Sequence, residues 1–159
     1  MKILAWNARG LGSSLAFNTL RSHKQDSKPE MMFLVQTRCQ HATLENWRIK
    51  LGFSVKLVVN SVGKSRGICL FWSDLVSDDL MTYSQEHIEV QIRSNCKQSW
   101  RFTGFYGHSD LNQRRHSWTL LRRLSGMYNL PWVCMGDINE VFWDQEKSGG
   151  LKKKWRAMT

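Results

Sequence analysis

Four polar residues follow apolar segments of the sequence, where their side chains could act on a phosphate group or a water molecule. The apolar residues 132–135 are followed by Gly136 and Asp137, with Asn139 two positions later. In an extended chain the side chains of such a pair point the same way. The carboxylate could then accept a proton from water while the amide donates to a phosphoryl oxygen. An Asx turn that ends the strand explains the same residues, and the sequence leaves both interpretations open.

Asn7 and Tyr106 occupy comparable positions. Asn7 follows the apolar residues 3–6 and precedes a glycine-containing turn, where asparagine is commonly a turn former. Tyr106 ends a segment in which Trp100, Phe102, Gly104 and Tyr106 alternate. Its hydroxyl could donate to an anion, although an isolated tyrosine in a strand usually packs in the core.

Hydrophobic patterns predict the elements that must position these side chains. Helices are expected after Ser13 or Ser14, from Thr43 to the glycine at 52, and after a cap at Ser109 or Asp110. Their predicted inward residues are Leu15, Phe17, Leu20, Leu44, Trp47, Leu51, Leu111, Trp118, Leu121 and Leu124. Strands are expected at residues 2–7, 31–35, 53–59, 68–72, 88–92, 100–106 and 132–135.

The order of these elements favours one class of fold. It begins β-α-β-α, continues with several strands, and ends α-β. The clean alternation of residues 88–93 predicts a half-buried strand with Glu89 on its polar side. We therefore expect an α/β sandwich of two mixed sheets, packed inside and flanked by helices.

The charge balance points to a polyanionic partner. The 159 residues contain 23 Lys and Arg against 13 Asp and Glu, a net charge of +10. Such a balance favours DNA, or RNA, although a solvated basic surface would look the same. Residues 62–65 resemble the end of a phosphate-binding loop, but Val58 stands where the motif needs glycine, so a basic hairpin loop is preferred. The candidate nucleic-acid contacts are Arg9, Lys64, Arg66, His108, Arg114 and Arg115.

The sequence also argues against other classes of protein. The first apolar run is too short for a signal peptide, and no window has the apolar length of a membrane span. An intracellular protein of the nucleus or cytoplasm, with no membrane contact, is therefore expected. The four cysteines form no C-x-x-C pair, so a zinc finger is disfavoured, and Cys39 with His41 is at most half a metal site.

Taken together, five ordered segments resemble a known family. They read MKILAWNARGLG, FLVQTR, WRFTGFYGH, LPWVCMGDINEV and EKSGG. They are similar to the endonuclease domain of plant LINE-type (non-LTR) retrotransposons, a branch of the endonuclease/exonuclease/phosphatase superfamily. The resemblance implies a four-layer α/β sandwich over residues 1–150 and Mg²⁺-assisted cleavage of DNA phosphodiester bonds, with no other cofactor.

The resemblance also implies a role for each of the four polar residues. Asn7 matches the asparagine that organises metal and phosphate, and Tyr106 the tyrosine that contacts the reacting phosphate. Asp137 matches the aspartate that orients or deprotonates the attacking water, and Asn139 the asparagine that stabilises the pentavalent phosphate. These roles suit in-line attack, in which negative charge grows on the phosphoryl oxygens.

Two departures from the family pattern predict weak or absent cleavage. Gln36 stands where the family has a metal-binding glutamate, and Mg²⁺ prefers a carboxylate. The family's C-terminal Asp-His segment has no counterpart in the basic residues 151–159, which contain neither Asp nor His, so a C-terminally truncated domain is expected. A non-catalytic basic nucleic-acid-binding module, a gene fragment without a stable product and a phosphatase of small phosphoesters remain as alternatives.

Overall fold

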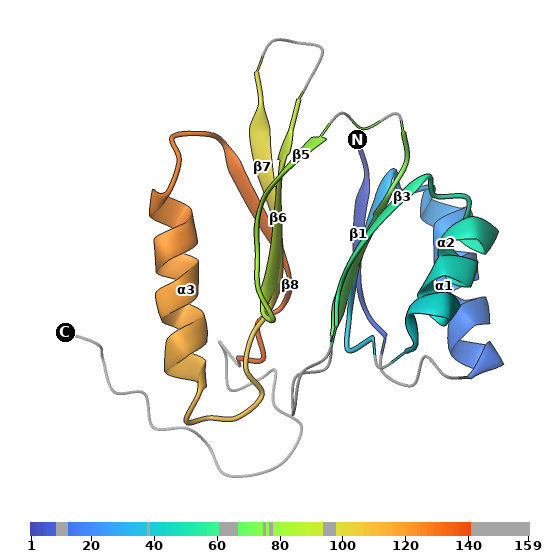
Figure 1. Ribbon diagram of the computed structural model, residues 1–159, viewed down its shortest axis with the longest axis horizontal. Coiled ribbons are helices and arrows are strands. Elements are labelled where there is room, and N and C mark those ends of the chain that lie inside the picture. The colour runs from blue at the N-terminus through green and yellow to red at the C-terminus, as the bar shows by residue number, and fades with distance from the viewer. Residues whose placement is uncertain are drawn as a thin grey trace.

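The described part of the chain forms four layers. The computed structural model describes residues 1–8, 13–37, 39–60, 67–74, 76, 78–93 and 98–140. Two four-stranded sheets of these residues lie face to face, with helices α1 and α2 outside one sheet and α3 outside the other (Figure 1). This confirms the expected α/β sandwich of two mixed sheets. The predicted domain limit at residue 150 lies outside the described residues.

The first sheet combines a parallel and two antiparallel pairings. Its strand order is β1-β2-β4-β3, with β1 parallel to β2 and β4 antiparallel to both neighbours. The strands are β1 Ile3–Asn7, β2 Met31–Val35, β3 Val55–Val59 and β4 Ile68–Trp72. Every residue of β2 and β4 is buried, as their continuous apolar runs predict for strands covered on both faces.

The second sheet has the order β5-β6-β7-β8. Its last two strands are parallel, and the other pairs are antiparallel. The strands are β5 Asp78–Tyr83, β6 His87–Ile92, β7 Trp100–Tyr106 and β8 Trp132–Asp137. The sequence patterns do not predict β5, because its residues DDLMTY do not alternate between apolar and polar types.

Apolar side chains of both sheets fill the space between them. Phe33 of β2 meets Phe102 of β7 edge to face, with ring centroids 6.5 Å apart. Ile88 and Val90 of β6 belong to the same buried cluster. These contacts hold the two sheets in a fixed relation, so side chains at their ends can share one site.

The three helices partly follow the predicted patterns. They are α1 Ser14–Ser27, α2 His41–Leu51 and α3 Arg114–Gly126. The predicted Ser13 cap is present, since its hydroxyl accepts the Ala16 N–H at 3.3 Å. The expected start of α3 is wrong, because Asp110 stabilises a turn through the Asn112 N–H and Gln113 is the residue before the helix.

Two predicted inward residues are exposed. Leu15 is 75% exposed and Leu111 is 65% exposed. Leu15 lies in the first turn of α1, away from Leu20, and Leu111 precedes α3 instead of belonging to it. No helix in the described ranges has both the length and the apolar character needed to cross a membrane.

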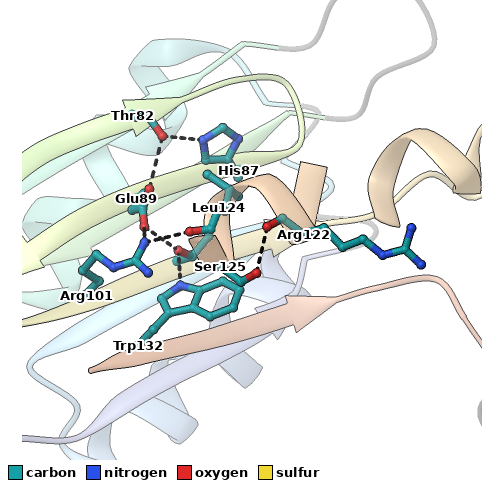
Figure 2. Close-up of polar contacts among 9 residues, drawn as sticks. Thr82, His87, Glu89, Arg101, Arg122, Leu124, Ser125 and Trp132 are labelled. Carbon is teal, nitrogen blue, oxygen red and sulfur yellow. Dashed lines mark hydrogen bonds and ion pairs between the residues drawn. The ribbon is translucent and has the colours of Figure 1, made fainter. Parts of the chain in front are cut away.

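The prediction of a half-buried β6 is wrong. Glu89 is completely buried beneath α3, together with Arg101 of β7, which is 1% exposed. The two side chains form an ion pair, and Arg101 Nη1 also donates to the Leu124 carbonyl of α3 at 3.1 Å (Figure 2). The polar face of β6 is therefore covered by the helix, because a counter-charge is available on the neighbouring strand.

Neutral polar groups extend this buried network. Thr103 Oγ1 accepts from Trp132 Nε1 at 2.8 Å and lies 3.4 Å from Glu89 Oε1. On the other side, Thr82 Oγ1 lies 2.7 Å from His87 Nε2 (Figure 2). We define Glu89, Arg101, Thr82, His87, Thr103 and Trp132 as the α3 anchor network. Its residues come from all four strands of the second sheet, and Arg101 connects them to α3, so the network fixes the helix on the sheet.

The α3 anchor network contains a histidine that resists protonation. Burial lowers the pKa of His87 to about 4, and the nearby positive charge of Arg123 contributes. In the unfolded chain an ordinary histidine titrates near 6.5. The unfolded state therefore binds a proton between these values while the folded state does not, and stability falls as the pH is lowered through this window.

We expect the free energy of unfolding to fall by about 1–2 kcal/mol between pH 7.5 and pH 5 because of His87. Urea unfolding at several pH values measures this change, and most carboxyl groups remain ionised over that range. His87→Gln should flatten the dependence, whereas His116→Gln on the exposed face of α3 should not. An equal pH dependence in wild type and His87→Gln would contradict the assignment.

Candidate functional site

The carboxyl ends of β1 and β8 meet at one edge of the sandwich. Asn7, the last residue of β1, donates from Nδ2 to Asp137 Oδ2, the last residue of β8, at 3.2 Å. The two residues are 130 positions apart in the chain and belong to different sheets. In Figure 1, β1 and β8 both end at the lower edge of the sandwich. Strands of both sheets thus bring an amide and a carboxylate to one place.

Tyr106 joins this pair through strand register. It is the last residue of β7 and lies opposite Asp137 in the parallel pairing of β7 with β8, so both side chains face the other sheet. Tyr106 is 7% exposed, and its backbone N–H donates to the Glu86 carbonyl at 2.7 Å. The structure therefore places Tyr106 beside Asp137 at the carboxyl ends of β7 and β8, and Asn7 contacts Asp137 from the other sheet.

Asp137 also makes the Asx turn that the sequence leaves open. Its Oδ1 accepts the Asn139 backbone N–H at 2.9 Å. Asn139 has a left-handed backbone (φ 55°), and its Nδ2 donates to the Gly107 carbonyl at 2.6 Å. The expectation that Asp137 and Asn139 point the same way in extended chain is therefore wrong, since β8 ends at Asp137. The turn keeps Asn139 at the site and joins it to the loop after β7.

Two glycines allow this close approach of loop and strand. Gly107 donates its N–H to the Asp137 carbonyl at 2.8 Å, and a side chain on it would overlap the Ile138 carbonyl. Gly136 has φ 148°, and a side chain there would overlap the Phe105 carbonyl. Residues 136–139 thus form the turn that ends β8 and also carry polar side chains of the candidate site.

Gln36 follows β2 directly beside this site. Its predecessor Val35 is the register partner of Asn7, and Gln36 itself is 4% exposed. Its backbone is left-handed (φ 61°), and the buried Thr37 hydroxyl has no hydrogen-bond partner in the described part of the chain. A strained backbone and an unsatisfied hydroxyl are costly, and such features gather at functional sites.

The donor chemistry of these residues does not fit Mg²⁺ well. Asp137 supplies the carboxylate, and each of its oxygens accepts an N–H from an asparagine. Asn7 and Gln36 offer neutral amide oxygens. Across the described ranges, no three acidic, histidine or cysteine side chains converge on one point. Since Mg²⁺ favours carboxylates among its few protein ligands, this set predicts weak metal binding.

Two of the predicted nucleic-acid contacts, Arg114 and His108, lie near the site, and each faces a carboxylate of this chain. Arg114 at the start of α3 pairs with Glu140 at 3.1 Å, so a phosphate would compete with that carboxylate. His108 is exposed, and its Nε2 lies 3.8 Å from Glu86 Oε1. Arg115 is exposed on α3. The remaining candidates, Arg9, Lys64 and Arg66, lie outside the described residues.

Sequence patterns do not reveal the residues that hold the rim of the site. Ser117 Oγ donates to Glu86 Oε2 at 2.7 Å and accepts the His108 N–H at 2.9 Å. Glu86 lies in a polar turn and Ser117 in a helix, 31 positions apart. Neither residue belongs to a recognisable motif. The only available signal is the general requirement that a buried serine hydroxyl has a hydrogen-bond partner.

Comparison with solved structures identifies the fold. The chain is similar to humanized D. rerio TDP2 carrying 14 mutations, with a TM-score of 0.64 and 15% identity over 91% of this chain and 67% of that one. It is also similar to the endonuclease domain of TRAS1, a telomere-specific non-LTR retrotransposon. The TM-score is 0.60, with 13% identity over 88% of this chain and 61% of that one. An AP endonuclease from Archaeoglobus fulgidus is similar as well, with a TM-score of 0.57 and 18% identity over 87% of this chain and 57% of that one.

These likenesses establish an architecture. All three are proteins of the endonuclease/exonuclease/phosphatase superfamily, which confirms the fold expected from the sequence motifs. The chain spans 57% to 67% of the length of these structures. No protein-family model matches the sequence, and no curated protein does.

Proposed function

We propose, from the endonuclease/exonuclease/phosphatase fold of this chain, that it is a retrotransposon-endonuclease-like domain that binds the phosphodiester backbone of nucleic acid. DNA is the proposed substrate, and RNA is the alternative. The observation that carries the proposal is the Asn7–Asp137 hydrogen bond, because it joins the ends of both sheets into one polar site. The similarity to the TRAS1 domain supports the retrotransposon lineage.

The proposed roles follow from the chemistry of each group. The Asp137 carboxylate could accept a proton from an attacking water. The Tyr106 hydroxyl and the second N–H of the Asn139 side chain could donate to phosphoryl oxygens as negative charge grows there. Asn7 orients Asp137 through the bond at 3.2 Å. Because Gln36 brings no charge to help hold Mg²⁺, we propose that cleavage is weak or absent.

A non-catalytic nucleic-acid-binding module is the second candidate. Gln36 and the net charge of +10 favour it, since together they keep attraction for phosphate while weakening metal chemistry. In this case the same polar edge binds a phosphate without cutting the chain. The two candidates differ in one observable, the appearance of a nick.

We expect residues 1–159 to bind duplex DNA at low salt without Mg²⁺-dependent nicking. A supercoiled plasmid incubated with wild type and with Asp137→Ala should give the same trace of open-circular product. The physical reason is the single carboxylate among Asn7, Gln36 and Asp137, which holds Mg²⁺ poorly.

The opposite results are equally informative. Efficient nicking by wild type that disappears in Asp137→Ala would show that the chain is an active endonuclease. It would refute the proposal that cleavage is weak or absent. Absence of DNA and RNA binding at low salt, by protein with a cooperative thermal transition, would remove both candidate functions.

A further inference from the structure

The solvent face of α3 carries positive charge without a carboxylate to balance it. The helix contains four arginines and no aspartate or glutamate. Arg114 is paired with Glu140, whereas Arg115, Arg122 and Arg123 are exposed and have no carboxylate partner among the described residues. We call these last three residues the α3 arginine stripe. Because no acidic residue lies on this helix, the stripe presents positive charge that can attract an anionic ligand.

Helical geometry places the stripe opposite the buried face. Arg115 and Arg122 are seven residues apart and so lie on the same side, about 10 Å from each other along the axis. Arg123 adjoins Arg122, while Ser117, Leu121 and Leu124 face the sheet. In Figure 2 the Arg122 side chain extends away from the α3 anchor network. Arg115 and Arg122 therefore align along one side of α3, leading away from the candidate site, and Arg123 lies on the adjoining part of the helix surface.

The α3 arginine stripe carries two electrostatic costs. Arg115 lies in the first turn of α3, where the helix dipole disfavours positive charge. Arg123 disfavours protonation of the buried His87, so its charge is felt inside the protein. Neither cost is offset by an ion pair in the described ranges. A polyanion bound along the stripe would offset both.

The α3 anchor network fixes the helix that carries the stripe. Arg101 holds the Leu124 carbonyl from within the sheet, and Leu124 follows Arg122 and Arg123 directly. The start of the helix is held by the Arg114–Glu140 pair, next to Asn139 of the site. Side chains on a fixed helix lose less entropy when they bind than side chains on a loop.

We propose that the α3 arginine stripe is a second binding surface for nucleic-acid backbone, which continues the path of a strand from the candidate site along α3. A spacing of about 10 Å corresponds to about three nucleotide steps along one strand of a duplex. The stripe recognises phosphates and no particular sequence, because none of its groups is placed to read bases. The proposal rests on the proposed function, since it requires that the site itself engages nucleic acid.

The test compares DNA binding by three forms of the full chain. They are wild type, Arg122→Gln/Arg123→Gln, and the control Arg21→Gln/Lys50→Gln, which removes the same charge from exposed positions on α1 and α2. Fluorescence anisotropy with a 20–30-base-pair duplex, at several salt concentrations, gives the slope of log K against log salt. For the stripe variant we expect a slope less negative by about 1–2 and an affinity about tenfold lower at low salt. The control should stay close to wild type.

A second readout locates the contact. A hydroxyl-radical footprint should shorten by about three nucleotides in the stripe variant, at the end away from the site. Equal slopes and equal footprints for the stripe variant and wild type would overturn the stripe while leaving the proposed function intact. If wild type bound no nucleic acid, both would fail. Binding to phosphatidylserine vesicles that the stripe variant alone loses, with DNA binding unchanged, would also overturn the proposal.

Discussion

Glu89→Gln is expected to lower the free energy of unfolding by about 3–5 kcal/mol. The substitution preserves the size of the side chain and removes the negative charge that faces Arg101. Both residues are at most 1% exposed, so the guanidinium would remain buried with no carboxylate opposite it. A domain of ordinary stability has about 5–15 kcal/mol to lose, so this single change brings it close to unfolding.

Denaturant unfolding of four forms measures the effect. Glu45→Gln is the matched control, because Glu45 is also paired with two cations, Arg48 and Lys56, but at the surface. Partly exposed ion pairs contribute less than fully buried ones, so its unfolding midpoint should fall much less than that of Glu89→Gln. The double variant Glu89→Leu/Arg101→Met should be far more stable than Glu89→Gln, since it removes both buried charges.

Two outcomes would refute the importance of this ion pair. One is a Glu89→Gln midpoint indistinguishable from wild type. The other is a double variant as unstable as Glu89→Gln, because that would mean that lost packing rather than an uncompensated charge is responsible. If Glu89→Gln did not fold at all, the double variant and Glu45→Gln would still distinguish an uncompensated buried charge from lost packing.

Gln36→Glu is expected to raise the affinity for Mg²⁺ at least about tenfold. Gln36 is buried and follows Val35, the register partner of Asn7, so it lies at the same end of the sheet as the Asn7–Asp137 contact. A glutamate would add a second carboxylate to that of Asp137. In the absence of metal the two negative charges repel each other, and a divalent cation relieves the repulsion.

Thermal unfolding with and without MgCl₂ provides the measurement. A ligand at ten times its dissociation constant stabilises the folded state by about 1.4 kcal/mol, which raises Tm by about 3–6 °C in a chain of this size. Wild type and the exposed control Gln40→Glu should show little change. A Mg²⁺-dependent rise in wild type equal to that in Gln36→Glu would contradict our view that the glutamine weakens the metal site.

The sequence by itself determined most of the local structure, with β5 and the start of α3 as exceptions, and it pointed to the polar residues proposed for the site. Continuous apolar runs predicted β2 and β4, and helical spacing predicted the buried Leu44, Trp47 and Leu51. The ordered motifs pointed to Asn7, Tyr106, Asp137 and Asn139 and to the fold that the solved structures confirm. These features are readable because periodicity, capping and turn chemistry depend on residues close together in the chain.

Only the tertiary structure decided which of these residues meet and which charges are buried. The Asn7–Asp137 contact spans 130 positions, and the Ser117–Glu86 contact spans 31. Glu89 looked solvated on an alternating strand, yet Arg101 on the neighbouring strand and α3 above it enclose it completely. Alternation specifies which side chains share a face, but burial depends on what packs against that face, and sheet register and helix docking set this over long separations.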